Sequence, residues 1–168
     1  MKPTTPILHI ALVEPDIAPN VGTIARYCAA NGIRLHLIGK LGFRLTDKAL
    51  RRAGLDYWEH VDLHEHVSWM AFRDNYPSMR CHSLSAKAGI RYFDVAFQHG
   101  DCLILGSETS GLSSGFLDGS LGIQVCTIPM FNRAVRCLNV AMAAGIVASE
   151  ALRQIRLTGS TLPTDHSI

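Results

Sequence analysis

Short apolar runs separated by polar segments organise the chain, and they predict the strands of a β-sheet. These runs lie at residues 7–13, 34–38, 79–84, 102–106 and 123–129. Apolar runs of this length, bounded by turn-forming residues, are typical of buried strands.

Helical periodicity follows the first strand. Apolar residues recur at helical spacing from Val21 to Cys28, and Asn31-Gly32 predicts where that helix ends. Asn20 is suited to cap its beginning, because its side chain accepts hydrogen bonds from backbone N–H groups.

Two further helices are expected, a short one from Thr46 or Asp47 to Arg52 and a long one from Leu138 to Ile155. The long segment contains no proline and many alanines, which favours a helix. Its apolar face is predicted to comprise Leu138, Met142, Gly145, Ala148, Leu152 and Ile155. Strands that alternate with helices indicate an α/β domain with a largely parallel sheet.

The composition indicates one globular domain. Of 168 residues, 48% are hydrophobic and 18% charged, so a core can form and global disorder is excluded. We expect residues 1–157 to form the domain and residues 158–168 a mobile tail. The apolar runs are too short to cross a bilayer, and the first residues lack the pattern of a signal peptide. Five cysteines, mostly within apolar segments, indicate core residues and a reducing cytoplasm rather than disulfides.

Positive charge is concentrated in one stretch, although the net charge is only +2. Residues 21–55 carry seven Lys or Arg against Asp47 alone, whereas residues 56–74 carry five acids against Arg73. The basic stretch is able to meet phosphate, and a solvated helix face explains the same pattern. Any nucleic-acid binding must therefore come from a local patch.

Common phosphate-binding motifs are absent. No G-x-G-x-x-G follows the first strand, and residues 106–111 have the glycine spacing of a P-loop without its lysine. The sequence therefore excludes an ordinary dinucleotide binder and a P-loop NTPase.

Two other catalytic patterns are weak. Gly111-Leu-Ser113-Ser-Gly115 matches a hydrolase nucleophile elbow, but its partners Asp165 and His166 would lie in the expected tail. His60, His64 and His66 do not share one helical face and have no cysteine nearby, so we predict no metal site.

Three loops carry polar residues after expected strands, where α/β sheets place ligands. They are Asn20-Val-Gly-Thr-Ile-Ala-Arg26, Gly106-Ser-Glu108-Thr-Ser-Gly111, and the segment from Ile128-Pro-Met to Arg136-Cys-Leu-Asn139. A glycine directly after a strand lets a flat ligand approach the backbone, and Glu108 offers a hydrogen-bond acceptor. Each loop alone is a weak signal, because turns also favour Gly and Asn.

Together, and in this order, the loops resemble the three motifs of the SPOUT superfamily of RNA methyltransferases. The patterns are N-x-G-x-x-x-R, G-x-E-x-x-G, and I-P-M followed by R-x-L-N before the last helix. The segments LVEPDIAPNVGTIARYCAANG, LHLIGKLGF and KALRRAGLDYWEHV are similar to the tRNA (cytidine(34)-2′-O)-methyltransferase group of that superfamily. The similarity runs from about residue 8 to about residue 155.

The resemblance implies a single SPOUT-type domain with a parallel sheet, flanking helices and a C-terminal trefoil knot, which is a rare feature among folds. It implies a homodimer that uses S-adenosylmethionine to methylate the ribose 2′-hydroxyl of the tRNA wobble nucleotide, cytidine or modified uridine. The positions that match cofactor contacts in the family are Leu84, Gly106, Ile128 and Cys137, with Leu138 beside them.

The resemblance also implies catalytic positions, namely Arg26, Asn20, Glu108 and Asn139. The ribose hydroxyl must lose its proton, but a guanidinium stays protonated at neutral pH. We therefore expect Arg26 to hold the target phosphate and to stabilise the negative charge that develops on the ribose oxygen.

Within the basic stretch, a segment typical of the group indicates contacts with tRNA by Arg44, Lys48, Arg51 and Arg52. Cys137 departs from the family, where serine is usual, and Ser85-Ala-Lys87 replaces a more usual Thr-Thr-Lys. Two alternatives stay open. One is the same chemistry at another RNA site, and the other is a catalytically silent RNA-binding module that keeps the fold.

Overall fold

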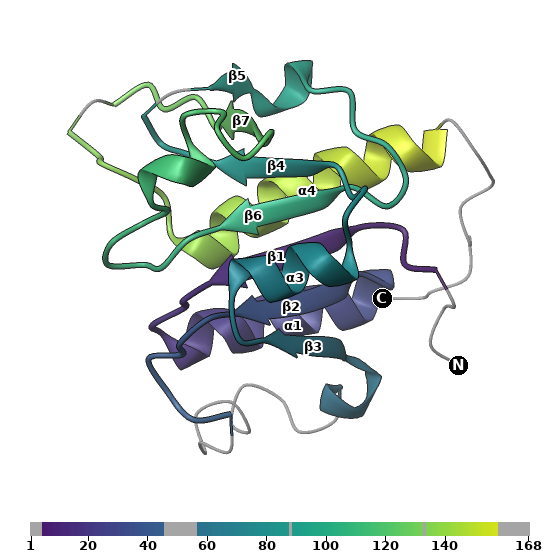
Figure 1. Ribbon diagram of the computed structural model, residues 1–168. Coiled ribbons are helices and arrows are strands. Elements are labelled where there is room, and N and C mark those ends of the chain that lie inside the picture. The colour runs from purple at the N-terminus through teal and green to yellow at the C-terminus, as the bar shows by residue number, and fades with distance from the viewer. Residues whose placement is uncertain (1–4, 46–56, 88, 133, 158–168) are drawn as a thin grey trace.

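A computed structural model describes residues 5–45, 57–87, 89–132 and 134–157, and it shows one β-sheet with helices on both faces (Figure 1). The seven strands lie in the order β3-β2-β1-β6-β4-β7-β5, and every neighbouring pair is parallel. The predicted α/β class and parallel sheet are therefore confirmed.

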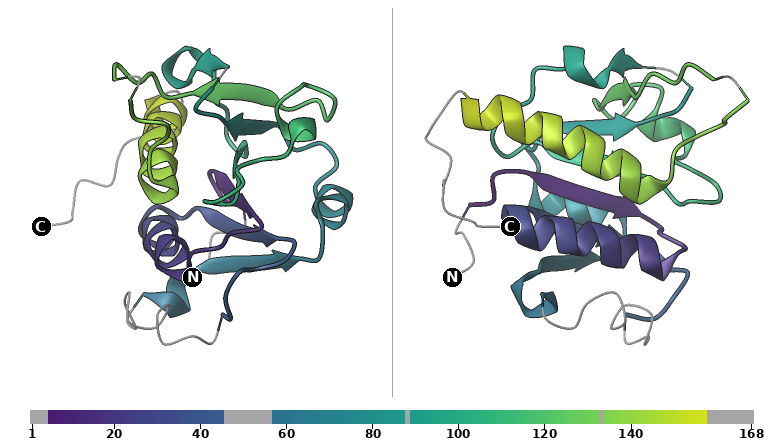
Figure 2. Two further views of the ribbon diagram at one scale, coloured as in Figure 1. Left: turned by 90° about the vertical axis from the view of Figure 1, so that its left-hand side faces the viewer. Right: turned by 180° about the vertical axis from the view of Figure 1, so that it is seen from behind.

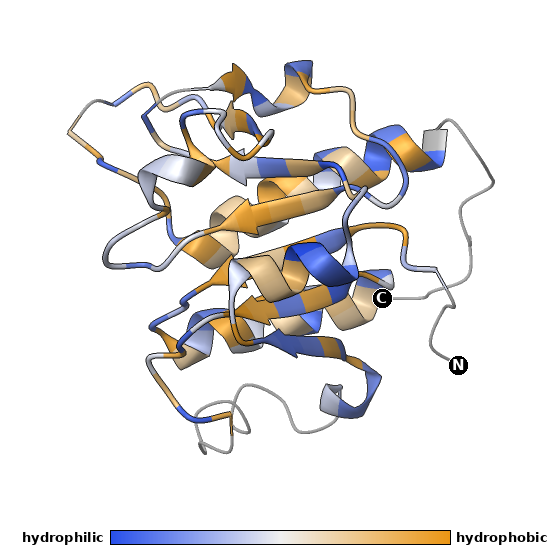
Figure 3. Cartoon of the chain, in the orientation of Figure 1, coloured by the Kyte–Doolittle hydropathy of each residue, from blue (hydrophilic) through white to orange (hydrophobic). Residues whose placement is uncertain are grey.

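Five of the seven strands coincide with the predicted apolar runs, whereas β3 and β5 were missed. Figure 3 shows the contrast between the apolar β6 and the polar β3, whose sequence is DLHEH. β5 has only two residues, which is too short to leave a pattern. The strand bounds are β1 His9–Val13, β2 Arg34–Ile38, β3 Asp62–His66, β4 Cys81–Leu84, β5 Ile90–Arg91, β6 Cys102–Leu105 and β7 Gln124–Thr127.

Two long helices cover one face of the sheet, and a short helix covers the other (Figure 2). α1 (Ala18–Asn31) and α4 (Val140–Leu157) pack side by side, and α3 (Trp69–Asn75) lies on the opposite face. α1 ends as predicted at Gly32, which adopts a left-handed conformation with φ 66°. Three short 3-10 helices complete the description: η1 (Trp58–His60), η2 (Tyr92–Asp94) and η3 (Ser114–Phe116).

Two details of the helix predictions are wrong. Asn20 does not cap α1, because the helix begins at Ala18 and the amide of Asn20 bonds to a distant loop instead. Met142 was placed on the buried face of α4 but is 58% exposed. The buried stripe is rotated away from it and consists of Ala144, Val147, Ala148, Ala151, Leu152 and Ile155.

Some predictions fall on residues whose structure is not described. The short helix from Thr46 or Asp47 to Arg52 and the tail at 158–168 lie outside the described ranges. The trefoil knot stays a prediction from the resemblance. Within the described ranges, every helix is too short or too polar to cross a membrane.

Three buried histidines form a hydrogen-bonded row across β1, β2 and β3. Nδ1 of His9 lies 2.9 Å from Nε2 of His36, and Nδ1 of His36 lies 3.0 Å from Nε2 of His66. The rings of Phe72 and Tyr76 pack edge-on against His36. Burial is the main cause that lowers the pKa of His9 to about 4 and the pKa of His36 to about 2. The imidazoles of His9 and His36 are therefore neutral at pH 7.

We expect the free energy of unfolding to fall as the pH drops below about 6.5, the ordinary pKa of histidine. The unfolded chain binds protons there, whereas the folded chain binds them only near its depressed pKa values, so acid favours unfolding. Between pH 7 and pH 5, His9 and His36 should each remove about 2 kcal/mol. Thermal unfolding across this range measures the effect. His36→Gln should flatten the pH dependence. Equal slopes in wild type and His36→Gln would contradict the expectation.

Candidate active site

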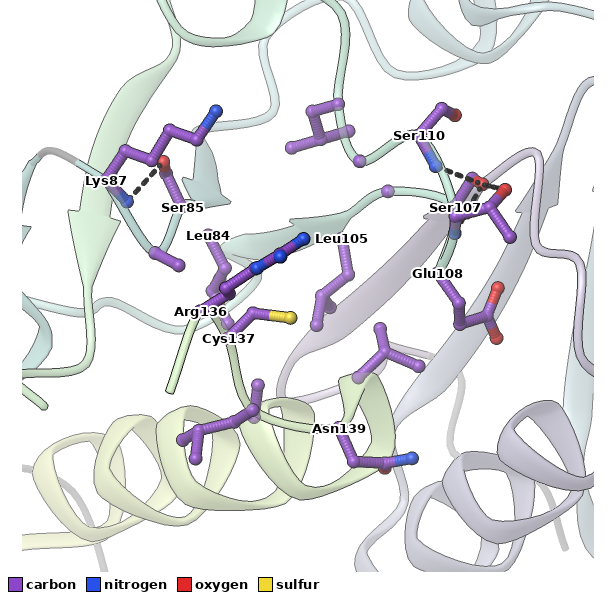
Figure 4. A pocket seen from close by; sticks show the side chains of 18 of the residues that line it. Leu84, Ser85, Lys87, Leu105, Ser107, Glu108, Ser110, Arg136, Cys137 and Asn139 are labelled. Carbon is purple, nitrogen blue, oxygen red and sulfur yellow. Dashed lines mark hydrogen bonds between the residues drawn. The ribbon is translucent and has the colours of Figure 1, made fainter. Parts of the chain in front are cut away.

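A cavity of about 510 Å³ lies at the carboxyl ends of the central strands. Its walls come from the segments that follow β1, β4, β6 and β7 and from the beginning of α4 (Figure 4). This is the edge of a parallel sheet where ligands bind in α/β proteins. The structure places all five predicted cofactor-binding residues on its wall: Leu84, Gly106, Ile128, Cys137 and Leu138.

The cavity combines apolar walls with a few polar groups. Leu84 and Leu105 line it from β4 and β6, and Figure 4 shows Arg136 and Cys137 extending toward them. Four cysteines are buried core residues as predicted, but Cys137 is exposed, because it belongs to the loop that forms the cavity wall. Lys87 and Arg136 bring positive charge to the same wall.

Gly106 follows β6 directly and cannot carry a side chain without moving the backbone. A Cβ atom there would lie 2.4 Å from the carbonyl carbon of Gly111 and 2.5 Å from the nitrogen of Leu112. The loop turns back because the N–H of Gly111 donates to the carbonyl of Ser107 at 2.9 Å. The glycine therefore lets residues 107–111 fold against the strand end beside the cavity.

A chain of hydrogen bonds connects three of the four predicted catalytic residues. Nδ2 of Asn20 donates to Oε1 of Glu108 at 3.0 Å, and Nδ2 of Asn139 donates to Oδ1 of Asn20 at 3.0 Å. These bonds fasten the segments after β1, β6 and β7 to one another at the edge of the cavity. All three residues line it.

Asn139 has a second role that the sequence analysis missed. Its Oδ1 accepts the backbone N–H groups of Ala141 at 2.9 Å and Met142 at 3.2 Å, so it caps α4. An asparagine directly before the apolar helical segment was the available signal. The side chain that fixes the start of α4 is thus the same one that bonds to Asn20.

The two carboxylate oxygens of Glu108 bond to the segment between β1 and α1 and to the first turn of α1. Oε2 accepts the backbone N–H of Asp16 at 2.8 Å, and Oε1 accepts the amide of Asn20. The carboxylate is therefore directed toward the protein, and its geometry gives it the role of holding two loops together. Asp16 is a further residue that the sequence analysis missed, since nothing local distinguishes it from an ordinary loop aspartate.

Arg26 lies apart from this cluster. It is exposed on α1, and its guanidinium carbon lies 4.8 Å from the ring centroid of Tyr57. The hydroxyl of Tyr57 donates to the carbonyl of Gly22 at 2.9 Å, which fixes the ring against α1. Within one chain, the structure does not bring Arg26 to the wall of the cavity.

The predicted RNA-binding residues are only partly described. Arg44 is exposed in the segment that follows β2. Lys48, Arg51 and Arg52 lie outside the described residues, so their contacts with tRNA stay a prediction from the sequence.

The weaker motifs do not assemble into other sites. Ser113 precedes η3 and is not part of the cavity wall, while Asp165 and His166 lie outside the described residues. His66 belongs to the buried histidine row. Across the described ranges, no group of three or more His, Cys, Asp or Glu side chains has the arrangement of a metal site.

A parallel α/β sheet with three polar loops at one cavity defines a class of protein, and comparison with known families identifies it. The profile of the SpoU rRNA Methylase family matches residues 7–149. The chain belongs to this family.

Individual relatives are similar along almost their whole length. The chain is 42% identical over 154 residues to the tRNA (cytidine(34)-2′-O)-methyltransferase of Saccharophagus degradans. It is 40% identical over 156 residues to the tRNA (cytidine(34)-2′-O)-methyltransferase of Escherichia coli. These matches cover 92% and 93% of this chain and 99% of each relative.

Solved structures agree with this assignment. A structure that concerns the 2-OH methylation of C/U34 on tRNA superposes with a TM-score of 0.82 and is 42% identical, covering 91% of this chain and 97% of that one. The SpoU methyltransferase AviRb of Streptomyces viridochromogenes, solved with AdoMet, has a TM-score of 0.81 at 23% identity and covers 94% of this chain and 63% of its own. The second likeness supports the fold alone.

Proposed function

We propose that this protein is an S-adenosylmethionine-dependent tRNA 2′-O-methyltransferase that acts in the cytoplasm on the wobble nucleotide, cytidine or modified uridine at tRNA position 34. The observation that carries the proposal is the sequence identity to two relatives that are named for this activity. The chain is 42% identical to one and 40% identical to the other, and each match covers 99% of the relative. The position of the cavity supports it, because the three motif loops converge there.

The residues of the cavity fit S-adenosylmethionine. Its volume of about 510 Å³ is within the range of small-molecule sites. Leu84, Ile128 and Leu138 offer apolar walls for an adenine ring. The space beside Gly106 is filled by the backbone of Gly111 and Leu112, so this glycine shapes the loop at the cavity wall and does not leave room for a flat ligand. When bound, the cofactor supplies a methyl group on a sulfonium, which an oxygen nucleophile accepts. A backbone contact at Cys137 does not require the serine that is usual there.

The remaining roles follow from chemistry and position. Asn20, Glu108 and Asn139 hold the loops that shape the cavity. Arg26 lies outside the cavity of its own chain, so we assign it to the RNA. It holds the target phosphate and stabilises negative charge on the ribose oxygen as the hydroxyl proton passes to water. It does this by charge, because a guanidinium does not take up the proton.

The direct test is transfer of labelled methyl groups from S-adenosylmethionine to tRNA that lacks the modification. The enzyme should label this tRNA, and transfer only to other RNA would replace the substrate while keeping the chemistry. A silent RNA-binding module would bind cofactor and RNA without transfer, and Cys137→Ser would then be the first change to test for recovered activity.

A homodimer is part of the proposal. Ile17 and Met142 lie at the beginnings of α1 and α4 and are 42% and 58% exposed, on helices that pack side by side. We expect a dimer contact to cover these two side chains, because removing exposed apolar surface from water favours association. Light scattering should give twice the chain mass of 18.4 kDa. Met142→Glu should reduce it, whereas Met70→Glu on the opposite face should not; a wild-type monomer would contradict the dimer.

The basic stretch should contribute to tRNA affinity through phosphate contacts. We expect the double variant Arg51→Ala/Arg52→Ala to weaken tRNA binding and to reduce the slope of log Kd against log salt by about 1 for each lost contact. Arg91→Ala is the control, because Arg91 pairs with Asp94 outside this stretch. Binding titrations at several salt concentrations measure the slope. An unchanged slope would show that Arg51 and Arg52 face solvent and do not contact tRNA.

A further inference from the structure

Asp16 forms hydrogen bonds with three successive residues of the loop that carries Glu108, namely Ser107, Glu108 and Thr109. Its backbone N–H donates to Oε2 of Glu108 at 2.8 Å. Its carboxylate oxygen Oδ2 accepts the hydroxyls of both neighbours of Glu108, Ser107 and Thr109, the second at 2.5 Å. Backbone and side chain of one residue therefore hold three consecutive residues of the opposite loop.

The carboxylate also sets the internal turn of that loop. A serine hydroxyl has one proton, and Ser107 donates it to Asp16. Its oxygen is then an acceptor toward the loop, and it receives the backbone N–H groups of Thr109 at 3.2 Å and Ser110 at 3.3 Å. Removal of the carboxylate would free this hydroxyl to rotate away from the turn.

Asp16 is itself fixed from the other side. The N–H of Gly42 donates to the carbonyl of Pro15 at 2.9 Å. Gly42 packs so closely that a Cβ atom on it would lie 2.8 Å from the Cα atom of Asp16. The backbone at Asp16 is thus held by the segment after β2, and the loop at 107–111 docks against a fixed point.

We infer that Asp16 is a positioning residue for methyl transfer, an inference that rests on the proposed function: its carboxylate holds Ser107 and Thr109 on either side of Glu108, and through the placement of Glu108 it holds the Asn20–Asn139 pair at the edge of the cavity. A small displacement of a positioning group costs up to about 10²-fold in rate. We expect Asp16→Ala, which keeps the backbone N–H, to lower kcat by at least about tenfold. The KM for tRNA should change much less, because the expected RNA contacts lie elsewhere.

A double-mutant cycle tests whether Asp16 acts through Glu108. Steady-state methyl transfer is measured for wild type, Asp16→Ala, Glu108→Gln and the double variant. The double variant should be no slower than Glu108→Gln alone, because Asp16 affects methyl transfer only through the position of Glu108. Asp118→Ala is the matched control: this carboxylate also caps a turn, accepting the N–H of Ser120 at 2.8 Å, but it lies outside the cavity wall. Thr109→Val removes one of the two hydroxyls that donate to the Asp16 carboxylate. It replaces Asp16→Ala in these measurements if that variant folds poorly.

Hydrogen exchange gives a second readout that does not depend on activity. The backbone amides of Thr109 and Ser110 should exchange faster in Asp16→Ala than in wild type or in Asp118→Ala. A kcat within twofold of wild type, additive effects in the cycle, or unchanged exchange at these amides would each overturn the inference. Failure of the proposed function would instead be seen as a wild-type protein that transfers no methyl group to tRNA.

Discussion

Gly106→Ala should weaken S-adenosylmethionine binding by more than about 100-fold. The new methyl group would lie 2.4 Å from the carbonyl carbon of Gly111. Because that neighbour is backbone and not a flexible side chain, residues 107–111 would have to move. The same loop forms part of the cavity wall and carries Glu108, so its displacement changes the shape of the cofactor site.

Isothermal titration with S-adenosylmethionine measures this loss, and circular dichroism checks that the variant is folded. Gly115→Ala is a matched control in η3, because a Cβ atom there meets only side-chain atoms at 3.7 Å or more. The control should bind the cofactor as wild type does. A folded Gly106→Ala protein with wild-type affinity would show that the close turn after β6 is not needed for the cofactor.

Arg26→Lys should lower turnover by about 10²-fold or more while it leaves the fold and the cofactor affinity intact. A lysine keeps the charge but lacks the planar fork that holds a phosphate with two parallel hydrogen bonds. Cofactor binding should not change, because Arg26 is not part of the cavity wall. This separation distinguishes a residue that serves the RNA from one that serves the methyl donor.

Single-turnover methyl transfer at saturating cofactor and tRNA measures the Arg26 effect. Arg153→Lys provides a comparison, because Arg153 is also exposed on a long helix and pairs with Glu150. It should retain wild-type turnover. Near-normal turnover in Arg26→Lys would remove this arginine from the mechanism.

The hydrophobic pattern predicted the five inner strands and missed β3 and β5, the strands at the two edges of the sheet. Strands buried on both faces become continuous apolar runs, as β6 shows with the sequence CLIL. β3 stays in the sheet although it is polar, because side chains of the adjacent strand β2 bond to its polar side chains. Nε of Arg34 donates to Asp62 at 2.7 Å, and His66 bonds to His36. Such partners come from another strand, so the local sequence does not reveal them.

The hydrogen bonds of the candidate site also join residues that are far apart in the sequence. Motif order was enough to propose the five cofactor positions, but the bond network could not be derived locally. Asn20 bonds to Glu108, 88 residues away, and to Asn139, 119 residues away. Only the sheet order, with β1 beside β6, brings these loops together. For this reason, the sequence suggested a helix cap at Asn20, and it did not predict the hydrogen bonds between Asp16 and residues 107–109.

Mapping the methylated nucleoside tests whether this protein methylates the wobble ribose of tRNA. Transfer RNA that lacks the modification is incubated with this protein and labelled S-adenosylmethionine, then digested and analysed nucleotide by nucleotide. We expect a 2′-O-methyl group on the ribose at position 34 and none in a reaction without protein. A methyl group at a different nucleotide, or none despite measurable cofactor binding, would contradict it.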